Sequence, residues 1–254
     1  MFFTQDTIDQ LSREFRTIHN KQCRLIELYT GRLFENERAQ EYANHGFIRR
    51  IYTLVRCIES VFSVAAPERE DLLTHNDRKD IEINLQAFIT NVFGCLDNLA
   101  WVWVLEKNIT REDGAILPNL SVGLHRKNKI VRQSFSNEFR EYLNSLEDWF
   151  KNLDDFRNAL AHRIPLYIPP YVITVNDIEE YNNLESEKLE ALQHQQFAEH
   201  ERLNRQQNAF KVFHPVMIHS IGEGSPREVF HAQILADFNT IDEISRKLIE
   251  ELNK

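Results

Sequence analysis

The segment DIEINLQAFITNVFGCLDNLAWVWVLEK, residues 80–107, decides the fold. Ile89, Val92, Leu96, Leu99 and Trp103 recur at helical spacing, and other apolar residues fill the faces between them. A helix that is apolar all round is buried on every side. This segment therefore predicts a central helix surrounded by other helices.

Two helical patterns precede this segment. The first follows Thr7, which forms a capping-box arrangement with Gln10, and Gly31 suits its end. The second covers about residues 35–65 and stops before Pro67. Together they predict two helices that pack against the central one.

A fourth helical pattern begins near Ser134 and carries a heptad-like apolar seam. Its members are Phe139, Leu143, Leu146, Phe150, Leu153 and Leu160. Arg157 occupies a seam position where an apolar side chain is expected. Because burying an unpaired guanidinium is very costly, Arg157 is expected to meet a carboxylate or to open onto a cavity. Asp97 and Asn98, polar interruptions in the central segment, are the candidates to face it; a buried structural ion pair would explain the same residues.

The chain after this pattern changes character. Residues 164–175 and 211–221 are rich in β-branched residues, which favours extended chain that pairs into a two-stranded stem. The polar stretch between them predicts a protruding helix or helical hairpin. A closing helix is expected from Ser225, with Pro226 at its first position. We expect a mainly α antiparallel bundle of residues 1–163 and 225–254, with residues 164–224 inserted.

Composition limits the classes of function. The 254 residues carry a formal net charge of −9, which argues against a general nucleic-acid-binding surface. Any RNA contact must then be local, and the best candidates are Arg126, Lys127, Lys129 and Arg132; an ordinary solvated loop is the alternative interpretation. With no signal sequence or long uncharged apolar run, we expect a cytoplasmic protein without a membrane partner. The three cysteines lack metal-site spacing, so no metal is expected.

The stretch FRNALAH, residues 156–162, contains the side chains of metal-free RNA cleavage. Histidine can transfer protons near neutral pH, and arginine forks onto phosphate oxygens. Arg157 and His162 would point about 140° apart on a regular helix, so they converge only if the helix ends or distorts between them. Pro165 places His162 in or beyond the last turn, so we expect Arg157 and His162 to lie within one polar cleft. The alternative is that His162 caps free carbonyls at the end of the helix.

This stretch resembles the signature of the HEPN superfamily (higher eukaryotes and prokaryotes nucleotide-binding): an arginine, then Asn, Asp or His, then a few residues and a histidine. The resemblance implies a HEPN-like helical bundle and a metal-independent endoribonuclease without a cofactor. It also implies a homodimer whose two motifs form one composite site, with roles in defence, as toxins, or in RNA processing. Arg157 would hold the scissile phosphate, Asn158 would orient His162 or the phosphate, and the two His162 copies would divide the proton transfers.

One residue departs from the pattern of HEPN toxins that are paired with nucleotidyltransferase antitoxins. Those usually carry a tyrosine two residues after the histidine, and here that residue is Ile164. Two further interpretations remain open. The chain could be a non-catalytic HEPN-like module that binds a nucleotide, RNA or a protein partner, as its acidic charge and polar insertion favour, or a purely structural helical scaffold.

Overall fold

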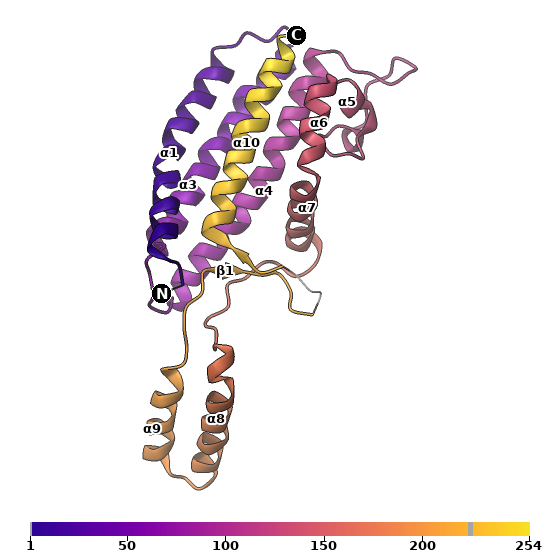
Figure 1. Cartoon of the computed structure of the whole chain (residues 1–254). Coiled ribbons are helices and arrows are strands. Elements are labelled where there is room, and N and C mark those ends of the chain that lie inside the picture. The colour runs from indigo at the N-terminus through magenta and orange to yellow at the C-terminus, as the bar shows by residue number, and fades with distance from the viewer. Residues whose placement is uncertain (1, 223–225) are drawn as a thin grey trace.

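The computed structural model describes residues 2–222 and 226–254 and confirms a mainly helical protein. Four long helices lie side by side (Figure 1). They are α1 (Gln5–Thr30), α3 (Ile48–Val64), α4 (His75–Glu106) and α10 (Phe230–Leu252). Helices α6 (Asn137–Ser145) and α7 (Glu147–His162) lie along one side of this bundle. Helices α1, α4 and α10 run in one direction, and α3 and α7 run in the other.

Helix α4 is the central helix that the sequence predicts. It begins earlier than expected, because Thr74 and Asp77 form a capping box before the apolar run. Leu85, Val92 and Leu99 are fully buried, and burying one such side chain contributes roughly 1.5–3 kcal/mol. The helix is long and apolar enough to cross a membrane, but 67% of its most apolar window is buried within the bundle. This burial is that of a core helix in a soluble protein.

The second predicted helix is present but not regular. It consists of α2 (Glu37–Glu41), a π-helical segment η1 (Tyr42–Phe47) and α3 without interruption. Gly46 lies in η1 against α4, and a Cβ there would come within 2.8 Å of Asn98 Cγ. The wider turn therefore coincides with a close contact between the backbone at Gly46 and the side chain of Asn98. In α1, the capping residue is Thr4 rather than Thr7, whose amide donates to Thr4 Oγ1.

The prediction of a single fourth helix from near Ser134 is wrong, because the chain forms two helices there, α6 and α7. A separate short helix, α5 (Lys129–Gln133), precedes them. Ser136 caps α6 by accepting from the amide of Phe139, and the chain turns again at Leu146. The side chain of Trp149, in the first turn of α7, donates from Nε1 to Asp237 Oδ1 of α10 at 2.7 Å. This bond connects the start of α7 to the bundle.

The extended segments on either side of the insertion pair by isolated antiparallel bridges, Tyr167 with Ile218 and Val172 with Val212. The one two-stranded sheet of the described residues joins β1 (Val216–Met217) to β2 (Glu228–Val229). The predicted start of the closing helix is therefore wrong: residues 228–229 form a strand, and α10 begins at Phe230. Ser225 lies outside the described residues.

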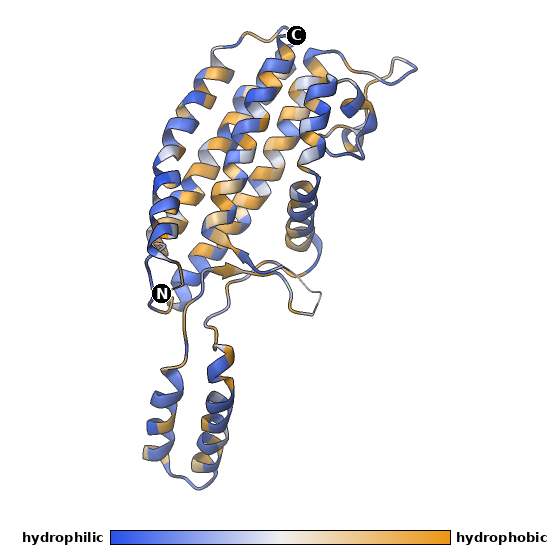
Figure 2. Ribbon diagram, in the orientation of Figure 1, coloured by the Kyte–Doolittle hydropathy of each residue, from blue (hydrophilic) through white to orange (hydrophobic). Residues whose placement is uncertain are grey.

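Helices α8 (Ile178–Gln193) and α9 (Phe197–Asn208) form an antiparallel hairpin that projects from the bundle (Figure 1), preceded by a short 3₁₀ turn, η3 (Val175–Asp177). Its own small apolar cluster contains Leu184, Ala191 and Leu203. Most residues of the hairpin are hydrophilic, whereas the bundle helices carry many more hydrophobic residues (Figure 2).

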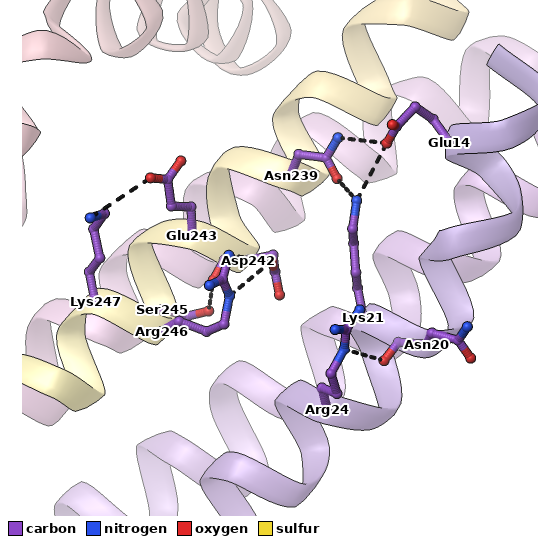
Figure 3. A network of polar contacts seen from close by, with 10 residues as sticks. All are labelled: Glu14, Asn20, Lys21, Arg24, Asn239, Asp242, Glu243, Ser245, Arg246 and Lys247. Atoms are coloured by element: carbon purple, nitrogen blue, oxygen red, sulfur yellow. Dashed lines mark hydrogen bonds and ion pairs between the residues drawn. The ribbon is translucent and has the colours of Figure 1, made fainter. Parts of the chain in front are cut away.

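Polar contacts join α1 to α10 along the outside of the bundle (Figure 3). Lys21 Nζ donates to Asn239 Oδ1 at 2.7 Å and lies 3.4 Å from a carboxylate oxygen of Glu14. Asn239 also donates to Glu14, which closes a three-residue network. These partly exposed contacts fix the register of two helices whose facing sides are apolar.

Candidate functional site

A cavity of about 320 Å³ lies beside Arg157. Helix α4 contributes Phe93, Asp97 and Trp101 to its lining, and α7 contributes Arg157. The other lining residues come from the segment after α4, which includes the 3₁₀ turn η2 (Asn119–Ser121): Asn119, Leu120, Val122, Gly123, His125, Lys127 and Asn128. We call this cavity the Arg157 pocket.

Arg157 is partly buried at the wall of this pocket. Its guanidinium carbon lies 4.9 Å from the centroid of the Phe93 ring, in a cation–π contact. Nη1 donates to Asn158 Oδ1 at 3.2 Å, and no carboxylate among the described residues comes within ion-pair distance. Arg157 thus opens onto a cavity, and the structural ion pair considered from the sequence is not formed. Its guanidinium remains able to bind an anion.

Asp97 lines the same pocket and contacts solvent. Partial burial raises the pKa of this carboxyl above its ordinary value, while Arg50, Arg157 and Lys127 act in the opposite direction. Asp97 and Arg157 therefore interact electrostatically across the pocket, but they form no direct ion pair that would neutralise the guanidinium.

Asn98 belongs to a different contact, on the side of α4 that faces α3. Its Oδ1 accepts from Arg50 Nε at 3.0 Å, and Arg50 Nη1 donates to Asn91 Oδ1 at 2.9 Å. Gly94 makes room for this guanidinium, because a Cβ there would come within 2.4 Å of Arg50 Cζ. Of the two predicted partners of Arg157, the structure thus brings Asp97 to the pocket and turns Asn98 towards Arg50.

His125 and Asn128 form the buried floor of the pocket, at 8% and 5% exposure. The ring of His125 packs against Phe150, and its Nδ1 lies 3.4 Å from Asp154 Oδ2. Burial lowers the pKa of His125, and Asp154 partly opposes this. His125 Nε2 and Asn128 Oδ1 are buried without a hydrogen-bond partner among the described residues. Such atoms are costly when left unpaired, so they are available to a polar ligand.

His162 is the exposed last residue of α7 and does not line the Arg157 pocket. The helix stays regular up to this end, where the amide of Arg163 donates to Ala159 O at 3.0 Å. Within one chain, Arg157 and His162 therefore diverge, and the expectation that they share one cleft is wrong. Asn158, also exposed, contacts Arg157 and not His162.

Another histidine comes close to the motif helix. His219, which is 1% exposed, lies with Nε2 3.0 Å from Asp155 Oδ2 of α7. Burial alone would raise the pKa of Asp155, but the bonds from Arg163 and His219 lower it. This contact connects the second half of α7 to the extended segment that follows the insertion.

The predicted cationic cluster divides between two surfaces. Lys127 lines the Arg157 pocket, whereas Arg126, Lys129 and Arg132 line a neighbouring groove. Phe93, Trp101 and Asn128 also line the pocket, and their sequence context predicts no functional role for them. One sequence feature could have pointed to this lining: Phe93 lies four residues before Asp97, a lone carboxylate on an otherwise apolar helix. Ordinary core packing produces the same pattern.

Comparison with protein-family models, with curated proteins and with solved structures finds no match for this chain. The functional argument therefore depends on the residues and their geometry.

Proposed function

We propose that this protein binds RNA at the Arg157 pocket and cleaves it without a metal, as a homodimer of HEPN type. One observation carries the proposal: Arg157 is held over Phe93, without a carboxylate within ion-pair distance among the described residues, at the wall of a cavity that also receives Lys127. A guanidinium in this state suits a phosphate oxygen and the charge that grows on it during cleavage.

In the proposed homodimer, the second copy of the chain brings a second His162 to the site, so that two histidines are available for proton transfer. Because His162 lies outside the Arg157 pocket of its own chain, a proton-transfer role requires the end of α7 to meet the equivalent end of another copy. His162 is exposed and has no hydrogen bond or ion pair with the residues that the structure describes, so it is free to enter such an interface.

The proposed reaction is an internal transesterification. One His162 accepts the proton of the 2′-hydroxyl, the 2′-oxygen forms a bond to phosphorus, and the bond from phosphorus to the 5′-oxygen breaks. The other His162 donates a proton to the leaving 5′-oxygen. The products are a 2′,3′-cyclic phosphate and a 5′-hydroxyl end, and Arg157 binds the non-bridging oxygens throughout.

An RNA-cleavage assay in EDTA tests this proposal. Wild-type protein should cut single-stranded RNA, leave 2′,3′-cyclic phosphate ends detectable by mass spectrometry, and fail to cut DNA of the same sequence. Cleavage that needs a metal, or cleavage of the DNA, would exclude this mechanism.

A second candidate function is RNA binding without cleavage in a HEPN-like module. The divergence of Arg157 and His162 on one regular helix favours it. In that case the protein binds RNA through the Arg157 pocket, and the RNA remains intact after long incubation. In either case we expect the protein to act in the cytoplasm.

A further inference from the structure

A second cavity, of about 500 Å³, is lined by residues of α5, of α6 and of the segment just before α5. Four cationic side chains line it: Arg126, Lys129, Arg132 and Arg140. Asn137, Asn144, Gln133 and one carboxylate, Glu141, complete the lining. We call this cavity the α5–α6 groove. Such an excess of cations is unusual in a chain whose net charge is −9.

Arg132 is the best evidence that the groove is built to meet an anion. Its side chain is only 6% exposed, Nη2 donates to Asn144 Oδ1 at 2.8 Å, and Nη1 is buried without a hydrogen-bond partner among the described residues. Burial lowers the pKa of Arg132 and Arg126 lowers it further, while the field of Glu147 opposes both. A buried cation that lacks a contacting counter-charge is stabilised when an anion occupies the adjacent groove.

The other cations of the groove are free to contact a ligand. Arg126 and Lys129 are exposed and form no ion pair with any residue that the structure describes. Arg140 donates to Asn137 and likewise has no carboxylate partner in the described ranges. Exposed cations without partners bind phosphates at little desolvation cost.

One short segment, residues 125–129, contributes to the lining of both the groove and the Arg157 pocket. Arg126 and Lys129 face the groove, whereas His125, Lys127 and Asn128 face the pocket. Successive residues of this segment thus serve two neighbouring cavities. Proteins that bind single strands follow the backbone with cationic side chains, so a strand held in the pocket can extend along this segment to the cations of the groove.

We propose that the α5–α6 groove binds the phosphate backbone of single-stranded RNA beside the scissile phosphate. This inference rests on the proposed RNA-binding function of the Arg157 pocket and adds a second subsite to it. The groove supplies affinity, and no residue in it acts in the proton transfers.

Binding of a cleavage-resistant strand tests the groove. The probe is a fluorescent 2′-O-methyl RNA about 12 nucleotides long, titrated with the full chain while its anisotropy is measured. The groove variant is Arg126→Glu with Lys129→Glu, both exposed. The control variant is Arg13→Glu with Arg24→Glu, two exposed cations of α1 on the opposite side of the bundle, which makes the same change in net charge.

We expect the groove variant to bind at least about tenfold more weakly than the control, with a shallower salt dependence. Each lost phosphate contact on a single strand should reduce the slope of log K against log salt by about 0.7. Binding of the groove variant that equals binding of the control would overturn this inference, whatever the cleavage assay shows.

The two proposals fail in different ways. If Arg157→Met binds the RNA as tightly as wild type while the groove variant binds it more weakly, the groove is an RNA-binding site and the Arg157 pocket is not. If wild-type protein binds no RNA at all, both proposals are wrong.

Discussion

Asp237 of α10 should make the stability of the protein depend on pH in a predictable direction. The side chain is 4% exposed, and its Oδ1 accepts from Trp149 Nε1 and Gln233 Nε2. Burial raises the pKa of this carboxyl to about 7, despite these two bonds, from an ordinary value of 3.8. Trp149 connects α7, and with it Arg157, to the bundle, so this buried carboxyl supports the candidate site.

The direction in which the free energy of unfolding changes with pH depends on whether the folded or the unfolded protein keeps the proton of Asp237. Below about pH 4 the carboxyl is protonated in both states, and between about pH 4 and pH 7 the unfolded chain loses the proton while the folded chain keeps it. The free energy of unfolding therefore falls across this window. A shift of about three pKa units corresponds to about 4 kcal/mol, which is an upper bound for the loss that is complete above about pH 7.

Asp237→Asn removes the titration and keeps an oxygen for both donors. Urea unfolding of wild type and of this variant should show a difference in unfolding free energy that favours the variant progressively from pH 4 to pH 8, by up to about 4 kcal/mol. His231, whose pKa burial lowers to about 4, makes wild type gain stability over part of this range. Because His231 is present in both proteins, its effect cancels in the difference.

Asp9→Asn, a change at an exposed carboxylate of α1, is the control. A difference between Asp237→Asn and wild type that stays constant from pH 4 to pH 8 would refute the reasoning, since it would mean that the folded protein holds Asp237 as an ordinary carboxylate.

Two further predictions follow from the packing and from the proposed site. Gly94→Ala should lower the free energy of unfolding by about 1–2 kcal/mol. Its methyl group would come within 2.4 Å of Arg50 Cζ and would displace this guanidinium from its hydrogen bonds to Asn91 and Asn98. Gly222→Ala, whose added methyl group would meet nothing within 4 Å, is the control, and equal thermal melts of the two variants would contradict this account. Light scattering at micromolar concentration should show that the wild-type protein is a dimer. Ala161→Glu, a change beside the exposed His162, should weaken this dimer. A monomeric wild-type protein would count against the composite site.

The sequence predicted the central helix well because burial on every side leaves a strong signal. Apolar residues on all faces of residues 80–107 are typical of a fully buried helix in a soluble chain. The break at Leu146 had no such signal, since the apolar seam continues through this residue and no Gly or Pro marks the turn. The strand at residues 228–229 is another tertiary effect: it pairs with β1, while the local pattern favours a helix.

The candidate site was predictable only in part. Arg157 was identifiable as a charge on an apolar seam, and its opening onto a cavity agrees with the cost of burying it. The contribution of His125 and Asn128 depends on how the segment after α4 folds across α4 and α7, which no local pattern encodes. His162 was expected to converge with Arg157, but Pro165 comes after the end of α7 and leaves the helix regular between the two residues.

The central claim is that Arg157 and His162 together cleave RNA without a metal. Its most direct test is the single-turnover rate of RNA cleavage in EDTA for wild type, Arg157→Met and His162→Ala, with the exposed His194→Ala of the hairpin as control. We expect His162→Ala to be slower by about 10²- to 10⁴-fold and Arg157→Met by about 10²- to 10³-fold, with His194→Ala unchanged. Wild-type rates in His162→Ala, or intact RNA after incubation with wild-type protein, would contradict the account.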